Sequence, residues 1–203
     1  MAIFSSDEDR VNTTRTLTAF ISILKRFTNP FILDLGPAVG KNVDFLTKTI
    51  PGCRLHVEDY LAKYVREEAP SDVELSRARS MLSNREHRYD GVLCWDTFDY
   101  LKHVDAQNLV SDLEGSLRPG GVLMLLHGTV KPKGLRLFQY EIVDEEHLCY
   151  RSVRVSENHR QIVLPNRAVE NLFPSFVISQ SILLKNEMRE VLFKRPVIFP
   201  EEE

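Results

Sequence analysis

Residues 31–40 read FILDLGPAVG, a short apolar run that ends in an acid and passes into a turn with two glycines. The run has the length and composition of a buried β-strand, and helical periodicity follows the turn. Such a turn brings backbone N–H groups and the positive end of a helix dipole toward a ligand, and glycine lets that ligand approach closely. We therefore expect a ligand site at the carboxyl end of this strand. Its candidate residues are Asp34, Gly36, Pro37, Ala38 and Gly40.

The pattern on either side of this stretch alternates apolar runs with helical segments, which is typical of a parallel sheet covered by helices. Strands are expected at residues 31–35, 53–57, 89–95 and 122–126, with one more near 73–75 in a weakly patterned stretch. Helices are expected at residues 11–27, 42–49, 60–68, 105–117 and 166–173. The segments 177–184 and 190–194 are joined by a short loop, so we expect a final antiparallel pair of strands.

Two further alternating segments, 135–143 and 148–155, predict a β-hairpin outside the main sheet. The whole pattern predicts a three-layer α/β/α Rossmann-like fold. Its seven-stranded sheet is mostly parallel, its last strand is antiparallel, and the hairpin is an insertion. The chain of 203 residues suits a single domain, 1–203, with a cofactor-binding core at 31–127 and a hairpin region at 129–165 that covers the cleft.

A second acidic position follows the next predicted strand. Glu58 and Asp59 lie 18 and 19 residues after Gly40. An acid there can accept hydrogen bonds from both hydroxyls of a ribose. The G-x-G-x-x-G turn of nicotinamide-dependent enzymes is not present after the first strand, because no second glycine follows Gly36 before Gly40. An NAD(P)-dependent oxidoreductase is therefore the least favoured alternative.

These features resemble the class I S-adenosylmethionine-dependent methyltransferases, of types 11 and 12. The resemblance extends over residues 31–126, and its motifs are the segments 33–40, 58–59, 93–96 and 117–123. It implies S-adenosylmethionine as the cofactor and methyl transfer as the activity. It also implies that the glycine turn wraps the methionine part and that Asp34 helps to hold its amino group. Asp59 best matches the ribose-binding acid, and Glu58 remains an alternative. The sequence departs from the family turn D-x-G-x-G-x-G at Ala38.

Methyl transfer is a displacement at an activated carbon, so the protein mainly aligns acceptor and methyl group. A base helps only when the acceptor must lose a proton. The candidate catalytic residues are Asp96 after the fourth strand and His127 after the fifth. Asp96 also matches a cofactor-contacting position of the family, but it can equally cap a loop. A lone histidine is more often a structural group.

Aromatic side chains near the same strand ends are candidates for lining the cofactor and acceptor pocket. Trp95 is one, although core packing is the more common role of such a residue. In the hairpin, Tyr140, Tyr150 and Arg151 are of interest because inserted segments often carry function on a shared fold.

Composition narrows the classes of partner. The net charge of −3 gives no broad positive field, so nucleic acid is not expected as a partner. No apolar run approaches the roughly 18 residues of a membrane span, so no membrane partner is expected. The three cysteines lie far apart, which predicts neither disulfides nor a metal site and suits the cytoplasm. A small-molecule acceptor is expected, and a non-catalytic binding or regulatory module is the main alternative. The sequence predicts neither the acceptor itself nor the oligomeric state.

Overall fold

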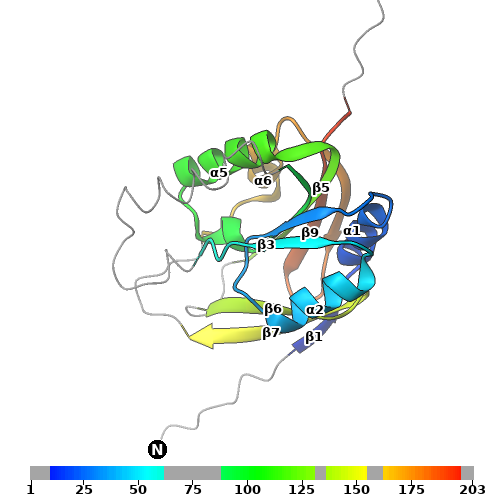
Figure 1. Cartoon of the computed structure of the whole chain (residues 1–203). Coiled ribbons are helices and arrows are strands. Elements are labelled where there is room, and N and C mark those ends of the chain that lie inside the picture. The colour runs from blue at the N-terminus through cyan, green and yellow to red at the C-terminus, as the bar shows by residue number, and fades with distance from the viewer. Residues whose placement is uncertain (1–9, 62–87, 131–135, 155–161, 198–203) are drawn as a thin grey trace, which may run out of the picture.

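The computed structural model describes residues 10–61, 88–130, 136–154 and 162–197 (Figure 1). In chain order the described elements are β1 (Arg10–Thr13), α1 (Thr16–Leu24), β2 (Phe31–Asp34), α2 (Gly40–Thr49), β3 (Arg54–Val57), β4 (Tyr89–Trp95), the 3-10 helix η1 (Thr97–Tyr100), α5 (His103–Ser116), β5 (Leu117–Gly128), β6 (Arg136–Asp144), β7 (His147–Arg154), α6 (Asn166–Leu172), β8 (Val177–Leu183) and β9 (Met188–Lys194).

The main sheet has the strand order β3-β2-β4-β5-β9-β8. The first four of these strands are parallel, whereas β9 is antiparallel to both β5 and β8. The mostly parallel sheet with an antiparallel end is therefore confirmed. The strand expected near 73–75 and most of the helix expected at 60–68 lie outside the described residues. The described sheet has six strands, and the seventh stays a prediction.

Alternating side chains of the central strands pack into two separate cores, as the period of two in a β-strand requires. Val92 and Cys94 of β4 belong to the core shared with α5 and α6. Leu93 and Trp95 of the same strand belong to the core shared with α1 and the β6–β7 hairpin. Figure 1 shows α5 and α6 on one face of the sheet, and α2 with the hairpin on the other. The predicted layered arrangement is confirmed for the described elements.

The predicted N-terminal helix is wrong at its start. Residues 10–13 form β1, which pairs antiparallel with β7, and α1 begins only at Thr16. Two oxygen acceptors support this late start. Thr14 Oγ1 accepts a hydrogen bond from the backbone N–H of Leu17 at 3.2 Å, and Glu190 Oε2 accepts one from Thr16 at 3.2 Å. Both satisfy N–H groups that a helix N-terminus leaves open.

Helix α5 and strand β5 begin earlier than predicted. Helix α5 begins at His103 instead of Asp105, so Asp105 lies in the first turn, where its charge suits the helix dipole. Strand β5 begins at Leu117 instead of residue 122, so it includes the Pro-Gly-Gly sequence at residues 119–121. The backbone of Gly120 has a φ of +82°, which favours glycine, and its N–H donates to the carbonyl of Arg195 at 2.8 Å.

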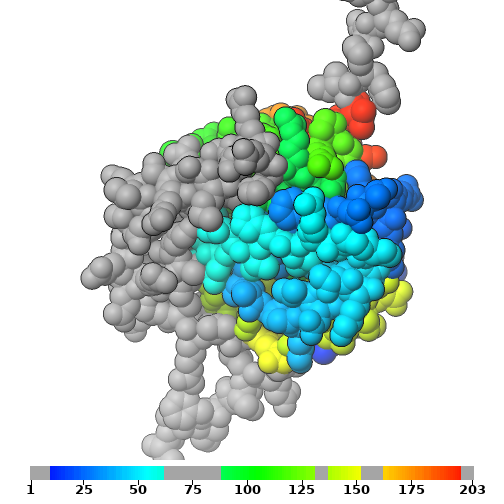
Figure 2. Space-filling model, viewed as in Figure 1, coloured from blue at the N-terminus to red at the C-terminus, as the bar shows by residue number. Residues whose placement is uncertain are grey.

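The hairpin forms outside the main sheet, as predicted. β6 and β7 pair antiparallel with Tyr140 opposite Tyr150, and β1 extends them to the order β1-β7-β6. Asn42 of α2 holds the hairpin in place, since its Nδ2 donates to the carbonyl of Tyr140 at 2.9 Å and its Oδ1 accepts from the N–H of Ile142 at 2.7 Å. In Figure 2 the surface of α2 and β3 faces the viewer, with the hairpin along the lower edge. The helix that follows the glycine turn therefore also positions β6.

Candidate functional site

Asp34 ends β2 and is only 1% exposed. Its Oδ1 accepts hydrogen bonds from the backbone N–H of Gly36 at 2.9 Å and from the indole Nε1–H of Trp95 at 2.6 Å. Burial raises the pKa of Asp34 from 3.8 to about 6, although these two hydrogen bonds partly offset the effect. The carboxyl group that the sequence placed at the glycine turn is therefore buried there without a cation beside it in the described part of the chain.

The two glycines of the turn have different surroundings. A Cβ atom at Gly36 would lie 2.6 Å from Cδ1 and 2.7 Å from Nε1 of Trp95, so the indole ring requires glycine there. A Cβ atom at Gly40 would have nothing within 4 Å. Between the two glycines, Pro37 is partly exposed and the methyl group of Ala38 is exposed. The departure from the family pattern at Ala38 therefore causes no packing conflict.

Two backbone hydrogen bonds fix the loop after β3 against β2. The N–H of Glu58 donates to the carbonyl of Asp34 at 2.8 Å, and that of Tyr60 donates to the carbonyl of Leu35 at 3.1 Å. Both acids of this loop are partly exposed. The charge of Asp59 contributes to the raised pKa of Asp34, whereas that of Glu58 acts on Tyr89. Of the two acids, Asp59 is thus the one whose charge acts on the glycine turn.

Trp95 ends β4 with a φ of +48°, a left-handed conformation that is unusual for a bulky residue. Its indole ring stacks on the phenol ring of Tyr140, with centroids 5.3 Å apart and an interplanar angle of 4°. Tyr140 in turn meets Tyr150 edge to face, with centroids 5.0 Å apart. An aromatic stack therefore joins the end of β4 to the hairpin and contacts the glycine turn through the indole.

Asp96 follows Trp95 and is 2% exposed. Its Oδ2 accepts a hydrogen bond from the hydroxyl of Tyr100 at 3.3 Å. Burial raises the pKa of Asp96 from 3.8 to about 7, and the hydroxyls of Tyr140 and Tyr100 partly offset that effect. The structure thus brings Asp34, Gly36, Trp95, Asp96 and Tyr140 together, and we call these five residues the Trp95 cluster.

His127 lies apart from the Trp95 cluster. Because side chains alternate along β5, His127 faces the same side as Leu123 and Leu125, which pack toward α5 and α6. Its Nδ1 lies 3.3 Å from the carbonyl oxygen of Gly128, and its Nε2 has no hydrogen-bond partner among the described residues. Burial lowers the pKa of His127, so the imidazole is neutral at neutral pH.

Two residues that support the site were missed by sequence reasoning. Asn42, 1% exposed, anchors β6, and nothing in the local pattern indicates a partner about a hundred residues away. Glu190, 0% exposed, supports the start of α1 and acts through its charge on Tyr150. An acid within the otherwise apolar stretch 190–193 of an inner strand was the signal that could have revealed it.

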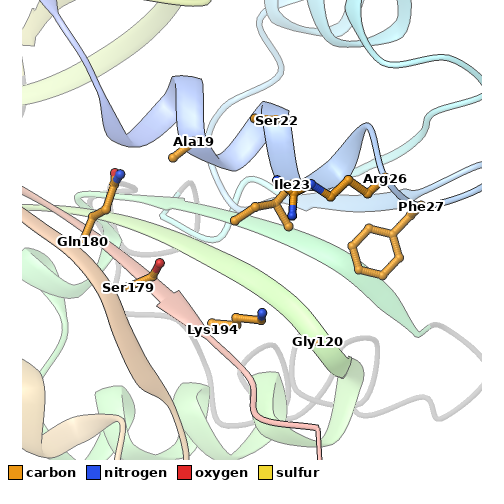
Figure 3. A pocket seen from close by; sticks show the side chains of 9 residues that line it. All are labelled: Ala19, Ser22, Ile23, Arg26, Phe27, Gly120, Ser179, Gln180 and Lys194. Atoms are coloured by element: carbon orange, nitrogen blue, oxygen red, sulfur yellow. The ribbon is translucent and has the colours of Figure 1, made fainter.

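A groove of ≈ 450 Å³ lies away from the cluster, between α1 and the β8–β9 pair (Figure 3). It includes Gly120, near the amino end of β5, whereas the Trp95 cluster is at the carboxyl ends of the parallel strands. No predicted site residue lines it.

In the described ranges, no three His, Cys, Asp or Glu side chains are placed to hold a metal ion. Of the helices described, none is long and apolar enough to cross a membrane.

No family model and no curated protein matches this sequence. Solved structures match its fold. An S-adenosylmethionine-dependent methyltransferase from Clostridium acetobutylicum has a TM-score of 0.51 and 14% identity, covering 90% of this chain and 92% of that one. The 1,6-didemethyltoxoflavin-N1-methyltransferase of Burkholderia thailandensis, solved with bound 1,6-didemethyltoxoflavin and S-adenosylhomocysteine, has a TM-score of 0.53 and 14% identity, with coverages of 90% and 78%. The glycopeptide N-methyltransferase MtfA has a TM-score of 0.50 and 14% identity, with coverages of 89% and 95%. The chain therefore has the Rossmann-like fold of the class I S-adenosylmethionine-dependent methyltransferases.

Proposed function

We propose that this protein binds S-adenosylmethionine and transfers its methyl group to a small-molecule acceptor. The observation that carries the proposal is a row of three carboxyl groups at one sheet edge. Asp59 follows β3, Asp34 ends β2 and Asp96 follows β4, and these three strands are neighbours in the sheet. In open α/β sheets this edge is where ligands bind. The fold shared with solved methyltransferases supports the same reading.

The carboxyl groups and the glycine turn suit the cofactor. Asp34 is a buried acceptor suited to an amino group, and Asp59 suits the ribose hydroxyls, with Glu58 as the alternative. The open space at Gly40 suits a close approach to the turn, which Pro37 and Ala38 border. The position of Trp95 suits cofactor binding less well, because its indole fills the space over Gly36. We assign these residues to holding the cofactor.

Asp96 is the residue that we assign to proton transfer. Its pKa of about 7 leaves the carboxyl group partly ionised near neutral pH, so it can accept a proton from an acceptor that must lose one. The hydroxyl of Tyr100 donates to that carboxyl at 3.3 Å and helps to hold it in place. His127 is the second candidate base, since its lowered pKa keeps it neutral, but it faces α6 instead of the Trp95 cluster.

The hairpin region 129–165 is assigned to the acceptor, within a single functional unit formed by residues 1–203. Phe138 of β6 is partly exposed, and its ring lies 6.4 Å from that of the buried Tyr140 between centroids, while the buried Tyr150 of β7 packs against both. Aromatic faces of this kind suit a planar, apolar acceptor better than a nucleic acid backbone. The net charge of −3 supports the same preference.

Calorimetric titration of the full chain with S-adenosylmethionine, and separately with NADH, tests the proposal. We expect binding of S-adenosylmethionine alone, and at least about tenfold weaker binding by Asp34→Asn, because a hydrogen bond to a charged group is lost. Asp44→Asn is the matched control, since Asp44 is an exposed acid on α2. Binding of NADH alone would replace the proposal with an oxidoreductase.

A second candidate function is a non-catalytic binding or regulatory module of the same fold. The specific observation in its favour is that the side chain of Trp95 fills the space over the glycine turn. This candidate predicts that neither the natural protein nor variants with a smaller residue at position 95 bind S-adenosylmethionine. The methyltransferase proposal predicts that at least the variants with a smaller residue at position 95 bind S-adenosylmethionine.

A further inference from the structure

The space over the glycine turn is occupied by a side chain of the protein itself. A Cβ atom at Gly36 would lie within 2.7 Å of two indole atoms of Trp95. That distance is shorter than any van der Waals contact, so the ring lies directly against the glycine. No atom of a ligand fits between the indole and Gly36. A molecule that needs the surface of Gly36 must therefore displace the indole.

Trp95 also uses the acceptor that such a ligand needs. Its Nε1–H donates to Asp34 Oδ1 at 2.6 Å, and this same oxygen accepts from the N–H of Gly36. The indole N–H plays the same part as the amino group assigned to Asp34 above, since both are nitrogen donors directed at a carboxylate. Trp95 and an amino ligand therefore compete for Oδ1 of Asp34 and for the space beside it.

The contacts that hold Trp95 in this place come from a different part of the chain. The ring stacks on Tyr140, and Asn42 fixes the backbone of Tyr140 by the hydrogen bond to its carbonyl. The backbone of Trp95 has a φ of +48°. Bulky residues keep such a conformation only where surrounding contacts impose it. Opening of the stack would therefore remove part of what keeps the indole over Gly36.

We propose that Trp95 is an internal competitor for the methionine part of S-adenosylmethionine, so that the cofactor binds only when the indole leaves Asp34 and its stack with Tyr140 opens. The inference rests on the proposed function. Because Tyr140 belongs to β6, departure of Trp95 also loosens the hairpin assigned to the acceptor. Cofactor binding and acceptor access are thereby coupled through one pair of rings.

Trp95 is the only tryptophan of the chain, so its fluorescence reports on this event directly. The experiment titrates the full-length protein with S-adenosylmethionine and follows tryptophan emission and calorimetric heat together. We expect the emission to move to longer wavelength as the cofactor saturates, because an indole that is 4% exposed becomes exposed to water. The midpoint of the emission change should equal that of the heat.

Two substitutions separate the hydrogen bond from the ring. Trp95→Phe keeps a ring but has no N–H donor, and we expect the dissociation constant for S-adenosylmethionine to fall about tenfold. Trp95→Gly also empties the space over Gly36, and glycine accepts the positive φ, so we expect a larger fall in the dissociation constant. Tyr140→Leu opens the stack without contacting Asp34 and should tighten binding in the same direction. Phe173→Leu, a buried aromatic of the opposite core, is the control that should bind as the natural protein does.

Circular dichroism confirms that each variant is folded before it is titrated. Binding by Trp95→Gly where the natural protein shows none supports the inference as strongly as the expected tightening does. Binding by the natural protein with unchanged emission, and with equal affinity in Trp95→Phe and Trp95→Gly, overturns the inference and leaves the proposed function standing. No binding by the natural protein or by any folded variant overturns both.

Discussion

Asp90 and Asp96 lie near opposite ends of β4, and both are buried, at 1% and 2% exposure. Asp90 faces a cation and a backbone donor, with Arg118 Nη1 at 3.2 Å and the N–H of Phe31 at 2.9 Å. Asp96 is surrounded by tyrosine hydroxyls instead, and burial raises its pKa to about 7. The same residue type thus has a cation beside it at the amino end of the strand, whereas at the carboxyl end its raised pKa suits it to exchange a proton. The two carboxyl groups differ in their partners and not in their depth.

The largest expected effect is on stability at the amino end. Asp90→Ala removes the acceptor of the Phe31 N–H and leaves Arg118 without its ion pair. We expect the free energy of unfolding to fall by about 1–3 kcal/mol, because a part-buried backbone donor loses its acceptor, while Arg118 is half-exposed and its charge stays hydrated. Urea denaturation measures this loss. A loss below about 0.5 kcal/mol, the usual range of surface substitutions, would show that the two ends of β4 do not differ in this way.

The next effect concerns the pH dependence of stability at the carboxyl end. The pKa of Asp34 is raised from 3.8 to about 6 and that of Asp96 to about 7. The folded protein therefore binds these protons more tightly than the unfolded chain. Their stabilising contribution is complete below about pH 4 and is lost as the pH rises through 6 and 7.

The substitution Asp96→Asn tests this dependence by removing one of the two titrating groups. Relative to the natural protein, we expect the variant to gain on the order of 2 kcal/mol between pH 4 and pH 8, measured by urea denaturation at both values. Asp44→Asn, at an exposed site, is the control. An Asp96→Asn variant whose stability changes with pH as that of the natural protein does would remove Asp96 from the titrating groups, and with it the main argument for its role as a base.

The contrast between the two ends also shows how far sequence reasoning extends. The run of residues 31–40 predicted the strand, the turn and the position of Asp34, because all three depend on local pattern. It did not predict that Tyr140 would cover Trp95, because that contact depends on Asn42 anchoring a distant strand. The predicted helix over residues 11–15 was wrong for the same reason, since the partner of β1 is the distant strand β7 (His147–Arg154). Local elements were predictable, whereas the contacts that assemble the site are long-range.

The smallest effects concern the turns at the two ends of the sheet. Ala38, exposed in the glycine turn at the carboxyl end, departs from the family pattern, and Ala38→Gly restores it. We expect a stability loss of about 0.5 kcal/mol, because glycine adds entropy to the unfolded chain, with no change in S-adenosylmethionine binding. Gly120→Ala at the amino end should cost about 1–2 kcal/mol, because its φ of +82° strains a residue with a Cβ atom. Thermal unfolding compares the two variants in one experiment. Tighter cofactor binding by Ala38→Gly would mean that the methyl group of Ala38 obstructs the site, and the competition assigned to Trp95 would then be shared with the turn itself.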